Sequence, residues 1–358
     1  MVKTFLLFFF PCAVYASLAL TSSESLVRAY SAFDEMQENI GGELLTLFHR
    51  SPTPSCNLRT LSRAWVDPFG NWLREGNTDH QIGFVSLTHG VAAGYDYAFN
   101  PSWAIGGGGA WNESDVTLHL GKGSGHAHRY AAAFYSDYTA KNAYLGMSIY
   151  GALADNFLAI NNDFSRDRIL LEKKQIYTYQ FTSRGKFDAY EMGTQFQGAY
   201  FFGVPACLFY PYGVFDLFYA ADSSFSSTAS FANQTEKVVF HIDSRSTVSV
   251  RGEAGVALQI QDLNFTETAC VSPTFALGWS MECPILRPPY HWTIQGLPYS
   301  FQSQGWNQTW QLFTFQFGLS IRYRMVTIAG NYYSELSPEG RHDVFWAEWG
   351  SVRLSANF

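Results

Sequence analysis

Residues 309–323 read TWQLFTFQFGLSIRY, and the alternation within this stretch underlies the fold prediction. Every second position is apolar, namely Phe313, Phe315, Phe317, Leu319, Ile321 and Tyr323. The positions between them are small or polar, namely Thr314, Gln316, Gly318, Ser320 and Arg322. Because successive side chains of a β-strand point to opposite faces of the sheet, the stretch predicts a strand with one apolar and one wet face.

The same two-residue period recurs through the rest of the chain and predicts about twelve strands. These segments span residues 63–76, 84–99, 103–120, 128–139, 142–155, 177–200, 206–220, 246–259, 267–280, 309–323, 324–335 and 342–358. Tight joins near Ala140 and Arg324 predict periplasmic turns. The long segments between strands predict external loops at residues 156–176, 221–245 and 281–308.

The composition decides between a soluble and a membrane-embedded β-protein. Aromatic residues make up 17% of the chain and charged residues 15%, against roughly 25% charged residues in a soluble domain. The second face of a soluble β-sandwich would carry many Lys, Glu and Asp. Here that face is mostly Gly, Ala, Ser, Thr and Gln. We therefore predict an all-β fold, a twelve-stranded antiparallel transmembrane β-barrel.

The start of the chain is typical of a secretory signal peptide. Lys3 is the positive residue, Phe5 to Phe10 form the apolar core, and Val14-Tyr15-Ala16 offers a cleavage site. After Ala16 no run approaches 18 apolar residues, so no membrane-spanning helix is predicted. We divide the chain into a signal peptide (1–16), a linker with an amphipathic helix (17–60) and a barrel (61–358), and expect it in the bacterial outer membrane.

The last strand carries an apolar set that ends on the final residue. The set is Val352, Leu354, Ala356 and Phe358. An aromatic residue at the end of an amphipathic last strand is typical of the signal read by the barrel assembly machinery. We predict that Phe358 has this role.

Residues 21–50 show a helical period instead. Apolar residues recur at three- and four-residue spacing, at Leu26, Tyr30, Phe33, Met36, Ile40, Leu44 and Leu47. Thr21 and Glu24 fit a capping box, and Gly41-Gly42 is expected to weaken or kink the helix.

No residue pattern points to catalysis, a metal or a cofactor. His126 and His128 could share one face of a strand, but no third ligand is evident and the other histidines are scattered. The net charge of −7 and the short basic runs argue against nucleic acid as a partner. In an exported chain the remaining cysteines can pair in three ways, which leaves the connectivity open among Cys56, Cys207, Cys270 and Cys283.

Four strand segments resemble the autotransporter β-domain family: residues 64–70, 90–97, 103–109 and 209–212. The aromatic richness and the cysteines also resemble the barrels of chlamydial polymorphic membrane proteins. The resemblance implies a helix threaded through the lumen, where residues 25–48 stand. Family members carry a large passenger ahead of that helix, and we expect no sizeable one here. Some members cut themselves at an Asn-Asn pair in the helix; Asn39-Ile40 stands here, so self-cleavage is not expected.

The alternation assigns a set of charges to the lumen: Asp96, Asp137, Glu191, Arg251, Glu253, Arg322 and Arg353. They could select solutes, dock the acidic helix residues Asp34, Glu35 and Glu38, or be solvated wall charges. We expect a non-enzymatic surface protein embedded in outer-membrane lipid and plugged by residues 25–48, with loops that contact host or neighbouring cells. The alternatives are a passive porin-like channel, an outer-membrane enzyme with a polar cluster on its rim, and a soluble secreted adhesin.

Overall fold

A computed structural model describes much of the chain beyond the first residues. It describes residues 29–32, 34–42, 44–45, 47, 62–76, 82–170, 173–204, 207–231, 237–260, 263–266, 269–296, 300–303, 309–337 and 345–357. The predicted signal peptide, the Thr21–Glu24 capping box, Cys56 and the assembly residue Phe358 lie outside the described residues.

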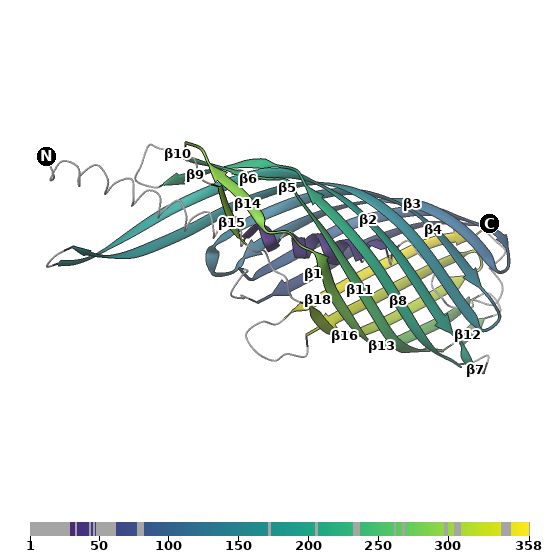
Figure 1. Ribbon diagram of the computed structural model, residues 1–358. Coiled ribbons are helices and arrows are strands. Elements are labelled where there is room, and N and C mark those ends of the chain that lie inside the picture. The colour runs from purple at the N-terminus through teal and green to yellow at the C-terminus, as the bar shows by residue number, and fades with distance from the viewer. Residues whose placement is uncertain are drawn as a thin grey trace, which may run out of the picture.

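Twelve antiparallel strands form a closed barrel, which confirms the predicted fold class (Figure 1). They are β1 (Arg63–Glu75), β2 (Phe84–Asn100), β3 (Trp103–Leu118), β4 (Gly123–Thr139), β5 (Ala143–Leu170), β6 (Lys173–Tyr200), β8 (Cys207–Asp222), β11 (Arg245–Ile260), β13 (Ala269–Leu286), β16 (Trp310–Tyr323), β17 (Val326–Leu336) and β18 (Trp346–Asn357). The first and last strands close the barrel, with Arg63 opposite Asn357 and Arg74 opposite Trp346.

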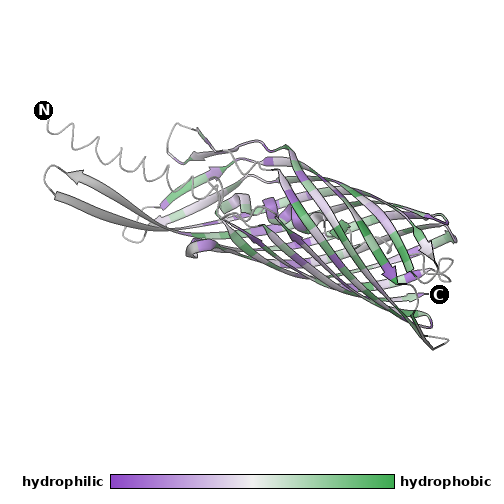
Figure 2. Ribbon diagram, turned by 90° about the horizontal axis from the view of Figure 1, so that it is seen from below, coloured by the Kyte–Doolittle hydropathy of each residue, from purple (hydrophilic) through white to green (hydrophobic). Residues whose placement is uncertain are grey.

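The two faces of each barrel strand differ as the alternation predicts. On β16 the side chains of Phe313 and Phe315 are 52% and 42% exposed on the outer surface, whereas Thr314 between them is 3% exposed. Hydrophobic residues alternate with paler and hydrophilic ones along the strands in Figure 2. This outward apolar face is the surface that lipid would cover, since each strand contributes to it.

The segments predicted as external loops are in large part strands, so these loop predictions were wrong. Strands β5 and β6 pair without interruption to Leu170 and Lys173, through the expected loop 156–176. Likewise β4 begins at Gly123, not at residue 128. The β5–β6 hairpin projects beyond the barrel wall (Figure 1). There it needs no apolar face, and so it carries no alternation to recognise.

Four short strands occupy the other two expected loops. They are β9 (Phe225–Phe231), β10 (Lys237–Ile242), β14 (Tyr290–Ile294) and β15 (Ser300–Ser303). They pair in the order β6–β9–β10–β14–β15 and form a small sheet, called the cap below. Three minor elements complete the described chain: β7 (Phe202–Val204) beside β8, β12 (Leu263–Thr266) beside β13, and a 3-10 turn at His119–Gly121.

A helix lies inside the barrel (Figure 1, purple). Its described residues are 29–32, 34–42, 44–45 and 47, called the lumenal helix below. Gly41 and Gly42, where the helix was expected to weaken or kink, are both helical. A Cβ atom at Gly41 would collide with the rings of Phe218 and Tyr150, so the glycine lets the helix approach the wall. The described residues contain no helix long and apolar enough to cross a membrane.

Candidate functional site

The lumenal helix begins in an aromatic cluster beneath the cap. Tyr30 meets Phe225 and Phe187 edge to face, with ring centroids 4.7 Å and 5.5 Å apart. Phe187 and Phe225 in turn stack at 4.9 Å. Phe240 and Trp292 of the cap, 0% and 3% exposed, belong to the same buried cluster. This end of the lumen is therefore a packed apolar core.

Asp34, one helical turn further, is bound by two residues from different strands. Its Oδ2 accepts hydrogen bonds from Arg245 Nη1 at 2.5 Å and from Tyr290 Oη at 2.8 Å. The Arg245 guanidinium also donates to the carbonyl of Pro288 at 2.9 Å and lies 4.0 Å above the Tyr290 ring. Both side chains of the ion pair are buried, 3% and 5% exposed. A buried pair with this many partners fixes the position of the helix.

A second arginine holds the next acidic residues of the helix. Arg287, which follows β13, donates to Glu38 Oε2 and lies 3.8 Å from Glu35 Oε2. Burial would lower the pKa of Arg287, but the charges of Glu38 and Glu35 outweigh it and raise that pKa above its ordinary value. The guanidinium therefore stays charged.

The barrel wall contacts the rest of the helix. Asn71 Nδ2 on β1 donates to Asn39 Oδ1 at 2.9 Å. Arg353 on β18 donates to the carbonyl of Leu47. Together with the Gly41 contact, these bonds hold the helix from the cap end to the middle of the lumen.

The seven charges assigned to the lumen occupy several separate groups. Arg251 and Glu253 share one network with Glu335 and Tyr333, in which Tyr333 Oη donates to Glu253 at 2.9 Å. Tyr212 also donates to Glu253, at 2.8 Å. Of the seven, Arg251 and Glu253 form an ion pair with each other, at 3.3 Å.

The other five lie in smaller groups along the wall. Asp96 binds Arg63 and accepts from Tyr135, and Asp137 accepts from Tyr144 at 2.8 Å. Glu191 forms an ion pair with Arg129 at 2.8 Å, and Arg353 forms one with Asp67 at 2.9 Å. Arg322 lines the cavity described below.

Several functional residues were missed in the sequence. Arg129 follows the alternation of its segment and could have been assigned to the lumen beside Glu191. Arg245 and Arg287 carried no such signal, because both stood in or beside expected loops, where no alternation assigns a face.

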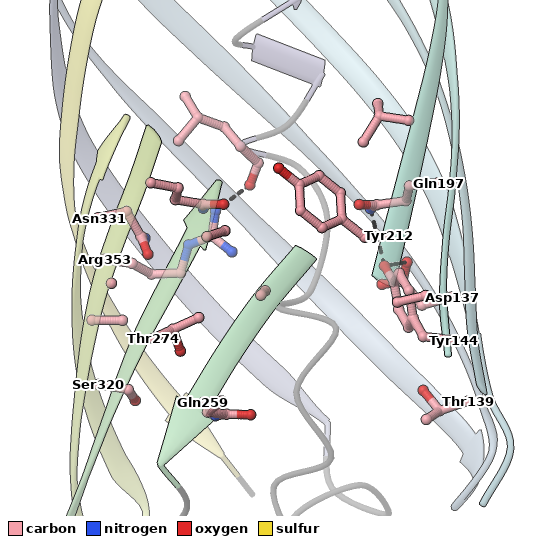
Figure 3. Close-up of a pocket in the computed structure, with 18 of the residues that line it drawn as sticks. Asp137, Thr139, Tyr144, Gln197, Tyr212, Gln259, Thr274, Ser320, Asn331 and Arg353 are labelled. Atoms are coloured by element: carbon pink, nitrogen blue, oxygen red, sulfur yellow. Dashed lines mark hydrogen bonds between the residues drawn. The ribbon is translucent and has the colours of Figure 1, made fainter. Parts of the chain in front are cut away.

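A cavity of about 370 Å³ lies beside the far end of the helix, lined by Gly42 and Leu47. Hydroxyl, amide and charged side chains, among them Thr139, Gln197 and Arg353, line its walls together with apolar groups (Figure 3). There Gln197 Nε2 donates to Tyr144 Oη at 3.0 Å, and Tyr144 donates to Asp137. The lumen thus has a packed aromatic cluster under the cap and a cavity toward Arg63 and Asn357.

The histidines give no convergent site in the described part of the chain. His126 and His128 stand on the outer face of β4, and the described residues contain no group of three ligands placed to hold a metal. On the cap, Ser226 Oγ lies 3.4 Å from His241 Nδ1, and His241 Nε2 lies 4.0 Å from Asp243. Both of the latter side chains are more than half exposed, so water screens the ion pair and the arrangement lacks the burial of an active site.

Comparison with known proteins identifies a related family and related barrels. The model of the autotransporter beta-domain family matches residues 64–333. The translocator domain of the autotransporter NalP from Neisseria meningitidis superposes with a TM-score of 0.65 at 12% identity, over 93% of this chain and 99% of that chain. The beta domain of the Bordetella autotransporter BrkA superposes with a TM-score of 0.52 at 13% identity, over 83% and 100%. No curated protein sequence matches the chain.

Proposed function

The chain belongs to the autotransporter beta-domain family, and on this basis we propose that it is an outer-membrane barrel whose lumen is plugged by its own helix. Family membership supports the outer-membrane location and a non-enzymatic role, because the related structures are translocator barrels. The signal peptide expected at residues 1–16 would deliver the chain to that membrane.

The observation that carries the plug is the way the helix is held. Asp34, Glu38, Asn39 and Leu47 are bonded to wall or cap residues, and Tyr30 is part of the apolar core. A helix resting loosely in a water-filled channel would have solvated side chains, whereas those of Met36, Ile40 and Leu44 are at most 1% exposed. A cross-section packed in this way would leave no path for ions.

The alternative is a passive channel, and single-channel conductance separates it from the plug. We expect the full chain to be closed in planar bilayers and a variant lacking residues 21–55 to conduct. Heat-modifiable migration on a gel would show that the deletion variant still folds as a barrel. Equal conductance from both proteins would remove the plug proposal and leave the channel.

We also propose that the part of the protein beyond the lipid is a contact surface on the cell. The cap and the projecting β5–β6 hairpin are the segments available for host or neighbouring molecules, while lipid and the barrel assembly machinery are the partners of the barrel itself. Antibodies raised against residues 237–242 should bind intact cells. Binding only after the outer membrane is permeabilised would contradict this orientation.

A further inference from the structure

The cavity beside the far end of the lumenal helix reaches one end of the barrel. Its lining includes Pro101 and Ser102 of the turn between β2 and β3, and Thr139, the last residue of β4. Short turns join the strands at this end, which is the end expected in the periplasm. Toward the middle of the lumen the cavity is bounded by Gly42 and Leu47 of the helix. A small solute that enters from the periplasmic end would therefore meet the helix.

One wall of the cavity carries hydroxyl and amide groups from three neighbouring strands. They belong to Thr274 on β13, Ser320 on β16 and Asn331 on β17 (Figure 3). The register brings them together, because Gly318 of β16 is opposite Thr274 on one side and opposite Asn331 on the other. All three side chains are partly exposed, and hydroxyl and amide groups can both donate and accept hydrogen bonds.

The facing wall holds a chain of hydrogen bonds and a tyrosine ring (Figure 3). Gln197 Nε2 donates to Tyr144 Oη at 3.0 Å, and Tyr144 Oη donates to Asp137 at 2.8 Å. Tyr212 Oη donates to Glu253 Oε1 at 2.8 Å, which fixes the position of the Tyr212 ring beside the cavity. An aromatic ring presents an apolar face, on which the C–H groups of a ligand can pack.

Ion pairs at the cavity bring opposite charges together. Arg353 lies 2.9 Å from Asp67, and Arg251 lies 3.3 Å from Glu253. Because the charges within each pair offset one another, these groups give no net charge that would select an ionic ligand. The choice of ligand is then left to the hydroxyl and amide groups of the walls.

A buried amide at the cavity has an unused acceptor. The Gln259 side chain on β11 is 5% exposed, and its Oε1 accepts no hydrogen bond from the described residues. The terminal torsion of a glutamine is soft, so this amide can turn toward a ligand. Leaving a buried acceptor unpaired is unfavourable, and a hydroxyl group that donates to Gln259 would remove that cost.

We propose that this cavity binds a neutral saccharide of one or two rings, taken up from the periplasmic end. Saccharide hydroxyl groups donate and accept hydrogen bonds, as the groups of the two walls do, and the C–H face of a sugar ring matches the ring of Tyr212. The cavity volume of about 370 Å³ lies within the range of about 300–1,000 Å³ that is usual for small-molecule sites. Because Gly42 and Leu47 form part of the lining, the site rests on the proposed plug, and a bound saccharide would stabilise the docked helix.

The test is calorimetric titration of the folded full chain in a detergent without a sugar headgroup. The probes are glucose, maltose and N,N′-diacetylchitobiose, with glucuronate and free lysine as charged comparisons. We expect saturable binding of at least one neutral saccharide, with a Kd of about 1 mM or lower. Asn331→Leu removes the amide and should weaken that binding about tenfold or more, and Ser320→Phe fills the cavity and should abolish it. Gln311→Leu, an amide removed from the outer face of β16, is the control and should leave the Kd unchanged.

Three results would overturn the saccharide site. They are no saturable binding of any of the three saccharides well above the expected Kd, tighter binding of glucuronate or lysine, and a Ser320→Phe variant that binds like the unaltered protein. Should a variant fail the heat-modifiability check, hydrogen exchange of the helix amides in the unaltered protein decides. Saturating saccharide should slow exchange near Leu47, and equal exchange with and without it would refute the site. Conductance judges the plug separately, so a closed full chain that binds no saccharide keeps the plug and loses only this site.

Discussion

Asp34 and Arg245 are 211 positions apart in the chain, yet Asp34 Oδ2 lies 2.5 Å from Arg245 Nη1 inside the barrel. Arg245 is the first residue of β11 and directly follows the β9–β10 part of the cap. The same guanidinium is held by Tyr290 of β14. The helix, the cap and the barrel wall therefore meet at one ion pair, which links the position of the helix to that of the cap.

Removing Arg245 should release the helix. In Arg245→Met the carboxylate of Asp34 stays buried without its cation, which costs about 3–5 kcal/mol when a buried pair is broken. We expect higher conductance and faster proteolysis of the helix. The double variant Asp34→Asn with Arg245→Met should reverse part of the rise in conductance, because no unpaired carboxylate remains buried. As a control, Arg184→Met on the outer face of β6 should leave the conductance unchanged. Unchanged conductance in Arg245→Met would show that the pair does not hold the plug.

Gly41 should not tolerate alanine, although alanine normally favours a helix interior by about 1 kcal/mol over glycine. A Cβ at Gly41 meets Phe218 and Tyr150, whereas one at Gly42 has only Arg251 Nη1 within 4 Å, at 3.9 Å. We expect Gly41→Ala to lower the temperature at which the helix unfolds or leaves the wall. Gly42→Ala should keep that temperature or raise it. Circular dichroism and helix hydrogen exchange measure both. A stabilised Gly41→Ala would mean that the helix sits further from the wall.

Arg129 and Glu191 should contribute to the stability of the wall itself. Their side chains are fully buried, with Arg129 Nη2 2.8 Å from Glu191 Oε1. Arg129→Met leaves a buried carboxylate and should destabilise the barrel by about 3–5 kcal/mol, seen as a lower urea midpoint of unfolding. Adding Glu191→Leu should restore most of the midpoint. If the double variant has a urea midpoint as low as that of Arg129→Met, the unpaired Glu191 carboxylate is not the cause of the lost stability.

Phe358 should matter for assembly more than for stability. Deleting it removes the last residue of the apolar set predicted from the sequence, which the assembly machinery is expected to read. We predict less heat-modifiable barrel in the outer membrane and more unfolded chain in the periplasm. Ser355→Ala, on the inner face of the same strand, is the control. Equal amounts of folded barrel from both variants would exclude a role for Phe358 in recognition.

The strand pattern could be predicted because lipid and lumen impose different chemistry on alternate residues. The segment 309–323 became β16 at Trp310–Tyr323, with the same residues outward. The pattern fails where that contrast ends. Residues 161–170 and 173–176 extend β5 and β6 past the start of β4, and the cap strands are too short for an alternation to stand out from chance.

The candidate site was predictable only in part, for the same reason. Alternation assigns Arg251 and Glu253 to one face, but it does not say that Glu335 and Tyr333 from β17 complete their network. The helical period placed Met36, Ile40 and Leu44 on one stripe, yet the same helix buries its acidic residues as well. A stripe predicts one buried face, whereas an enclosed helix is buried all round.

By itself the sequence determined the barrel, its strand number and which residues face outward, because these follow from a local two-residue period repeated in every strand. Only the tertiary structure decided what fills the barrel. The contacts of Asp34 with Arg245 and of Glu38 with Arg287 join residues more than 200 positions apart. Such pairings depend on closure of the whole sheet and on how the cap folds over it, and no local pattern carries that information.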